Sequence, residues 1–204
     1  MKARRTTPVK LFATLPSKGY GRLIVRYPYQ DDTNYAFAYR EAARRLASTF
    51  RGDAPDDLIL LPFLTLYRQA FELQVKEFIH FLAGLRRQYE GQSADTDRAV
   101  LEKRLQKDLG HNLHKLLNEA RKHYDALALD QPFPKSIENL LLMLHEADAT
   151  GTAFRYAGEF PDTQDHIDFP HLVKLLDDEW ELLDGVWAWI DDMHQAIPTL
   201  DELM

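Results

Sequence analysis

The sequence predicts a mainly α-helical protein, a helical bundle of about six helices with a small N-terminal β-hairpin. Apolar residues recur at three- and four-residue intervals over most of the chain. Glycines and prolines separate these periodic stretches, while a short alternating pattern is confined to the first thirty residues. With 204 residues, of which 45% are hydrophobic and 28% charged, the chain can bury a core of its own.

The first two elements follow from the N-terminal third of the chain. The alternating segment Val9–Tyr29 contains the turn residues Pro16–Gly21 and predicts the hairpin. An alanine-rich helix is expected over Tyr35–Phe50, because Asp31–Asn34 offers side-chain acceptors for an N-cap and Gly52 ends the periodic pattern.

The central element is a long apolar helix. We expect it to be capped by Asp56 or Asp57, to tolerate Pro62 in its first turns and to reach about Tyr89. An amphipathic helix over Asp97–Leu109 follows. The remaining elements are, in order, a helix that begins at His111 or Asn112 after Gly110, a helix over Ser136–Ala149, a loop or short strand over Thr152–Tyr156, and a helix that begins near Asp168.

The sequence shows no convincing domain boundary, so we expect one continuous domain over residues 1–204. Within it, residues 1–55 hold the hairpin and the first helix, and residues 56–197 hold the helical bundle.

Composition limits the classes of function. The chain has no cysteine, which excludes a disulfide scaffold and thiolate metal sites, and its histidines form no zinc signature. We therefore expect neither a metal nor a cofactor. The longest apolar run, Leu58–Tyr67, contains Pro62 and is far shorter than the roughly 20 residues of a membrane-spanning helix. We expect a cytoplasmic protein without a membrane anchor.

Charge constrains any contact with nucleic acid. The 25 basic and 32 acidic side chains give a formal net charge of −7, which opposes non-specific wrapping of nucleic acid. Contact with RNA must therefore be local, for example at a basic cleft.

One face of the central helix carries three charged residues. Arg68, Glu72 and Lys76 recur at four-residue intervals on a helix that is otherwise hydrophobic on most sides. One interpretation is a solvated stripe with an ordinary Glu–Lys pair. The other is a partly buried cluster that lines a cleft, where burial and neighbouring charges tune acid–base properties.

A second candidate is the pair Arg104 and His111, which are separated by six residues. Arginine stabilises phosphate charge, and histidine transfers protons near neutral pH. His111 follows Gly110 at a helix start, where backbone N–H groups favour anions. The alternative is a surface arginine and a capping histidine.

Three segments together resemble a bacterial group of HEPN-like helical proteins. They are the runs Leu61–Lys76, Gly110–Leu113 and Gly151–Tyr156, and the similarity covers roughly Leu58 to Ile190. The resemblance implies a helical bundle, often dimeric, from prokaryotic toxin–antitoxin or antiviral-defence systems. Many such proteins are metal-independent ribonucleases with an Arg-x(4–6)-His motif.

The resemblance implies roles for individual residues. Arg104 and His111 match the motif and would be catalytic, with His111 as acid or base during attack of the 2′-hydroxyl on the adjacent phosphodiester. The expected partners are RNA, an antitoxin or other defence-system protein, and a second copy of the chain as a homodimer. The residues expected to bind substrate or to line the cleft are Arg68, Glu72, Lys76, Asn112, Arg155 and Tyr156.

Several alternatives stay open at this point. Arg155 could pair with an acidic helix while Tyr156 fills the core. The whole chain could be a non-catalytic helical module that binds a partner protein or nucleic acid in a defence or regulatory system. A small-molecule enzyme that uses Glu72 and His111 is a third reading. We also expect five of these residues to meet at one cleft, namely Arg68, Glu72, Lys76, His111 and Arg155.

Overall fold

A computed structural model describes residues 30–91, 93–155 and 166–195. Within these ranges the chain forms six α-helices and three short helical turns, with no β-strand. The mainly helical prediction is therefore confirmed for this part of the chain. The predicted hairpin at Val9–Tyr29 lies outside the described residues. The helices all belong to the compact unit that begins at Asp31, so the first helix forms one body with the later ones.

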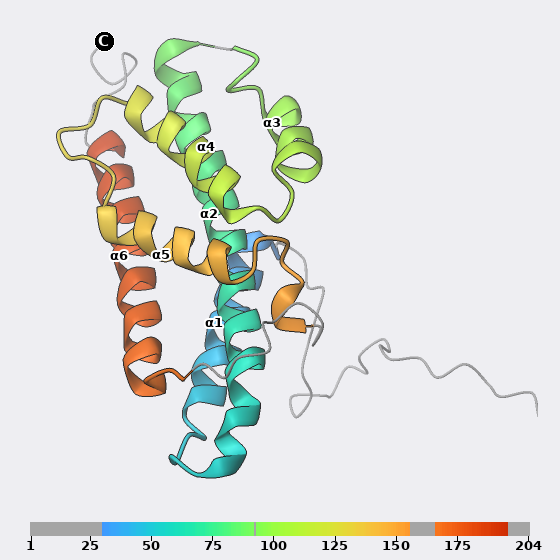
Figure 1. Ribbon diagram of the computed structural model, residues 1–204. Coiled ribbons are helices and arrows are strands. Elements are labelled where there is room, and N and C mark those ends of the chain that lie inside the picture. The colour runs from blue at the N-terminus through green and yellow to red at the C-terminus, as the bar shows by residue number, and fades with distance from the viewer. Residues whose placement is uncertain (1–29, 92, 156–165, 196–204) are drawn as a thin grey trace, which may run out of the picture. The chain divides into compact units, whose positions relative to one another are not determined.

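Helix α2 (Leu60–Glu90) is the central element, and α1 (Asp32–Ala47) packs along it (Figure 1). Asp31 caps α1, because its carboxylate accepts the backbone N–H of Asn34 at 2.9 Å. The 31 residues of α2 contact four of the other five α-helices, and they also contact the short turn that follows the fifth. These contacts explain why α2 carries apolar residues on most of its sides.

The link between α1 and α2 differs from the prediction. A 3₁₀ turn, η1 (Ala54–Ile59), precedes α2, and its N-cap is Asp53. Asp56 does not cap the long helix. Its carboxylate accepts the backbone N–H groups of Arg51, Gly52 and Asp53, and these hydrogen bonds lower the pKa of Asp56. Gly52 has a φ of 81°, a value that favours glycine.

The next helical segment is less regular than the sequence indicated. Helix α3 (Arg98–Arg104) passes directly into a π-helical turn, η2 (Leu105–Leu109), where one continuous α-helix was expected. Gly110 closes this turn with a φ of 55°. Asn112 then caps α4 (Leu113–Ala126), which agrees with the predicted start of this helix at His111 or Asn112.

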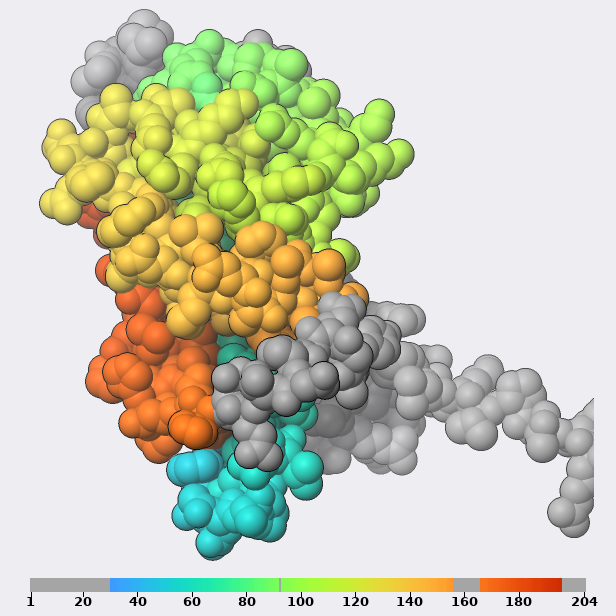
Figure 2. Space-filling view, viewed as in Figure 1, coloured from blue at the N-terminus to red at the C-terminus, as the bar shows by residue number. Residues whose placement is uncertain are grey.

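Two further helices complete the unit. Helix α5 (Lys135–Ala147) leads into a 3₁₀ turn, η3 (Ala153–Arg155), at the place where a loop or short strand was expected. The last helix, α6 (Phe169–Gln195), begins after Asp168, whose carboxylate accepts the backbone N–H of His171. In the view of Figure 2, α3, α4 and α5 form one continuous face.

The core lies between α2 and its neighbours. Trp180 of α6 is buried and packs edge-on against Phe71, with ring centroids 5.4 Å apart. Tyr67 donates a hydrogen bond to Asp177 of α6, which also accepts from Arg40 of α1. Burial, together with the Asp177 carboxylate, raises the pKa of Tyr67. No helix of the described residues is long and apolar enough to cross a membrane.

Candidate functional site

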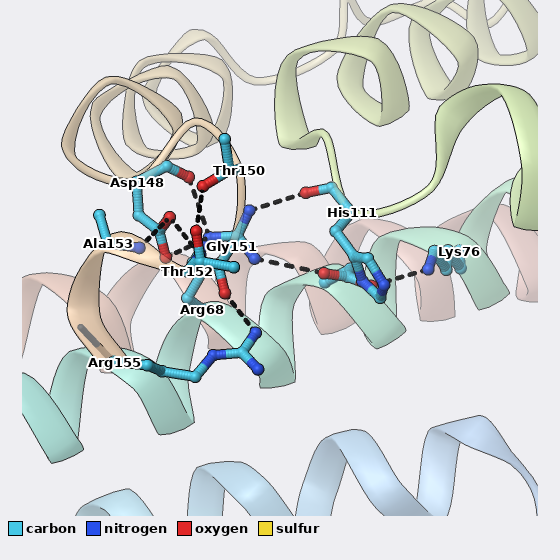
Figure 3. A network of polar contacts seen from close by, with 10 residues as sticks. Arg68, Lys76, His111, Asp148, Thr150, Gly151, Thr152, Ala153 and Arg155 are labelled. Atoms are coloured by element: carbon cyan, nitrogen blue, oxygen red, sulfur yellow. Dashed lines mark hydrogen bonds and ion pairs between the residues drawn. The ribbon is translucent and has the colours of Figure 1, made fainter. Parts of the chain in front are cut away.

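A buried carboxylate stands at the centre of the candidate site. Glu72, in the middle of α2, is only 1% exposed. Its Oε1 atom lies 2.7 Å from both Lys76 Nζ and His111 Nδ1, and its Oε2 atom lies 3.3 Å from the Arg68 guanidinium (Figure 3). The solvated-stripe interpretation is therefore wrong, since a buried carboxylate is tolerated only with partners of this kind.

Arg68 joins three separate parts of the chain. Its guanidinium donates to the backbone carbonyl of His111 at 2.7 Å and to that of Asp148 at 3.2 Å. It also forms an ion pair with the Asp148 carboxylate at 3.3 Å, and both side chains are buried. We call Arg68, Glu72, Lys76, His111 and Asp148 the Glu72 network. It holds α2, the start of α4 and the end of α5 together.

The loop after α5 is shaped around Arg68. Asp148 accepts the backbone N–H groups of Thr152 at 2.8 Å and Ala153 at 3.0 Å, so its carboxylate orders the loop while it pairs with the arginine. Gly151 has a φ of 79°, and a Cβ atom there would lie 3.0 Å from a guanidinium nitrogen of Arg68. The glycine is therefore required both by its backbone conformation and by its close approach to the arginine.

Arg155 borders a small cavity beside this loop. Its guanidinium donates to the carbonyl of Gly151, and the side chain stays exposed. The cavity has a volume of about 140 Å³, and Arg68, Gln69 and Tyr39 also line it. Arg155 is therefore a neighbour of the Glu72 network rather than a member of it. Tyr156 lies outside the described residues.

His111 differs from its partners because its side chain is 65% exposed. A carboxylate oxygen accepts hydrogen bonds and does not donate them, so Oε1 of Glu72 accepts from both Lys76 and the imidazole of His111. The proton of a neutral ring therefore lies on Nδ1. The lone pair is then on Nε2. Arg68 holds the backbone of His111 and Glu72 holds its ring at the protein surface, an arrangement in which Nε2 can accept a proton.

Asn112 has a structural role in this arrangement. Its side-chain oxygen accepts the backbone N–H of Lys115 at 2.9 Å and thereby caps α4. The cap fixes the direction in which α4 leaves the residue beside it, His111. The substrate contact expected for Asn112 stays a prediction, since the hydrogen bond of its side chain serves the helix cap.

Arg104 belongs to a different cluster. Its guanidinium lies 2.7 Å from Glu119 and 3.5 Å from Asp95. Glu119 is buried next to His123, whose Nε2 atom is 3.3 Å away. Burial opposes ionisation of Glu119, but the nearby imidazole of His123 and the charges of Arg104 and Lys122 outweigh that effect and lower its pKa. The structure therefore joins His111 to Arg68 and does not bring Arg104 into the Glu72 network.

Sequence reasoning did not single out His145, which lies near the network beside His114. The rings of His114 and His145 lie 5.7 Å apart, and the Nδ1 atom of His145 is buried without a hydrogen-bond partner in the described structure. Burial, followed by the charges of His114 and Arg68, lowers the pKa of His145. Asp148 was missed as well. Its only signal in the sequence was an acidic residue shortly before Gly151 at a helix end.

Comparisons with protein-family models, curated proteins and solved structures gave no match. Within the described residues, no group of three or more histidine, aspartate or glutamate side chains is arranged to hold a metal ion.

Proposed function

We propose that the protein is a HEPN-like, metal-independent endoribonuclease of the toxin or antiviral-defence type, in which His111 transfers the proton. One observation carries the proposal. An exposed imidazole is held through Nδ1, at 2.7 Å, by a carboxylate that is itself almost fully buried. Histidines arranged in this way are suited to general base catalysis.

In the proposed reaction, Nε2 of His111 takes the proton of a ribose 2′-hydroxyl. The 2′-oxygen attacks the adjacent phosphorus, and the bond from phosphorus to the 5′-oxygen breaks. The 5′-oxygen takes a proton from water as it leaves, and the protonated His111 then gives its proton to the solvent, so the products are a 2′,3′-cyclic phosphate and a free 5′-hydroxyl. Glu72 stabilises the imidazolium that forms, because its carboxylate faces the protonated Nδ1.

The surrounding cations divide into two roles. Arg68 is a positioning residue, since it is buried and its donors are used by Glu72, Asp148 and the backbone of His111. Lys76 is partly exposed, and Arg155 is exposed, so these two side chains supply the local positive charge that an RNA phosphate requires. The motif predicts a catalytic role for Arg104, but our proposal does not use it, because the Arg104 guanidinium pairs with Glu119 and Asp95. A homodimer, an antitoxin or another defence-system partner, and a cytoplasmic location are parts of the same proposal.

The test is RNA cleavage by the purified chain in EDTA. We expect cleavage with 2′,3′-cyclic phosphate ends, and we expect His111→Ala to abolish it. His171→Ala is the matched control, because His171 is an exposed histidine at the start of α6, whereas His111 lies at the start of α4. Equal cleavage by wild type and His111→Ala would exclude His111 as the acid–base group.

One observation favours a second function, that of a non-catalytic module that binds a partner protein or nucleic acid. Arg68 pairs with both Glu72 and Asp148 in the interior, as the charges of a purely structural network would. This alternative would be established if wild-type protein left RNA intact but bound one partner, and if His111→Ala bound that partner with the same affinity.

A further inference from the structure

A second cavity, of about 250 Å³, lies farther along α2 than the Glu72 network. It is bordered by α2, α3 and α6, and the residues that carry the argument are Glu77, His80, Phe81, Gly84, Arg98 and Trp187. None of them takes part in the Glu72 network. The volume is below the roughly 300–1,000 Å³ of pockets for drug-sized ligands, so the cavity suits one planar ring system.

Gly84 opens the cavity from the side of α2. A glycine inside a helix costs about 1 kcal/mol relative to alanine. A Cβ atom at Gly84 would meet no closer atom than the flexible end of Arg87, at 4.0 Å. Close packing therefore does not require this glycine. Its missing side chain leaves space that the cavity uses.

An aromatic pair lines the cavity. Phe81 of α2 and Trp187 of α6 are stacked, with ring centroids 5.2 Å apart and an interplanar angle of 25°. Both side chains are half-buried and line the cavity. Aromatic side chains in such positions bind nucleobases by stacking, with little dependence on sequence.

Glu77 supplies a polar group with a vacant acceptor. The side chain is half-buried and makes no hydrogen bond or ion pair with the described residues. Burial, followed by the nearby carboxylates of Asp32, Asp31 and Glu102, raises its pKa. The Glu77 oxygens are not among the fully buried polar atoms without a partner, so they are open to solvent and can accept a hydrogen bond from a ligand.

The cavity lies about three turns along α2 from the candidate active site and is rotated by about 120° around the helix axis. Glu72, Lys76, His80 and Gly84 follow one another at four-residue intervals. At 1.5 Å per residue, Gly84 is about 18 Å along the helix from Glu72, a distance that a few nucleotides of a single strand can span.

We propose that this cavity binds a nucleobase with an exocyclic amine, which stacks on Phe81 and Trp187 and donates to Glu77. Arg98, which is exposed at the border of the cavity, faces the attached phosphate. The role as a base-recognition site for an RNA strand rests on the proposed ribonuclease function. Binding of the base itself does not, because it requires no cleavage.

The test uses full-length His111→Ala protein and measures binding of cytidine, adenosine and uridine monophosphate by calorimetry. We expect cytidine or adenosine monophosphate to bind at least tenfold more tightly than uridine monophosphate, which has no exocyclic amine. Glu77→Ala is expected to weaken binding at least tenfold, and Gly84→Met to abolish it by filling the cavity.

Two controls keep the result decisive. Gly84→Ala fits the available space and should retain binding. Gly185→Met places the same new side chain in the middle of α6, where nothing lies within 4 Å of a Cβ atom, and should also retain it. Absence of binding for all three nucleotides at millimolar concentration, or unchanged binding by Gly84→Met, would overturn the base pocket.

The two proposals fail separately. If the chain binds nucleotides but never cleaves RNA, the proposed nuclease activity is excluded and the proposed base pocket is retained. If the chain cleaves RNA but binds none of the three nucleotides, the proposed base pocket is excluded and the proposed nuclease activity is retained.

Discussion

The Nδ1 atom of His111 lies 2.7 Å from Oε1 of Glu72, so an exposed ring contacts one of the most deeply buried charged groups among the described residues. The same carboxylate binds Lys76 and Arg68. Orientation of the histidine and stability of the fold are therefore linked through one residue.

This link makes Glu72→Gln a test of both properties. The amide removes the negative charge that stabilises the imidazolium, and we expect RNA cleavage to fall at least tenfold. It also leaves buried Arg68 with Asp148 as its one remaining carboxylate partner, so the free energy of unfolding should fall by about 3 kcal/mol. Urea denaturation followed by circular dichroism measures the second effect. A variant with unchanged cleavage would show that the carboxylate does not serve His111.

Gly151→Ala should disturb the loop that encloses Arg68. The new Cβ atom would lie 3.0 Å from the guanidinium, and φ is 79°, so we expect a loss of about 2 kcal/mol or more in the free energy of unfolding. Gly185→Ala in α6 is the control, because nothing lies within 4 Å of a Cβ atom there and helix propensity favours alanine. Equal melting temperatures of the two variants would argue against a constraint at Gly151.

Arg104→Ala and Arg68→Ala separate the two arginines. Arg104 contacts Glu119 and Asp95, so we expect Arg104→Ala to retain cleavage within about threefold of wild type. Arg68→Ala should lose both cleavage and stability, since it leaves Glu72 and Asp148 buried without their shared cation. A folded Arg104→Ala protein without activity would restore the catalytic role implied by the motif.

Alkaline pH should weaken the contact between α2 and α6. Burial raises the pKa of Tyr67 above its unfolded value of about 10. The raised pKa stabilises the folded state below pH 10, and that contribution is lost progressively as the pH rises above 10. Tyr67→Phe should be about 1 kcal/mol less stable at pH 7, because it lacks the hydrogen bond to Asp177, and should depend less on pH above 10.

The comparison needs a second tyrosine. Tyr35→Phe, at an exposed position of α1, should follow the wild-type curve of unfolding free energy against pH. If Tyr67→Phe also follows it, the hydroxyl of Tyr67 does not contribute to the alkaline loss of stability.

Much of the fold was predictable because helix limits depend on local signals. The caps at Asp31 and Asn112 and the positive φ values at Gly52 and Gly110 each act within about one turn of the chain. The π-helical turn at Leu105–Leu109 was missed, since its apolar pattern resembles that of an ordinary helix.

For the site, four-residue spacing was enough to predict that Arg68, Glu72 and Lys76 share one face of a helix. The groups that meet that face depend on contacts between helices. His111 is 39 positions from Glu72, and Asp148 is 80 positions from Arg68, whereas Arg104, only seven positions before His111, pairs with Glu119 instead. The physical reason is that spacing along the chain fixes neighbours within one helix, while contacts between helices depend on how their apolar faces pack.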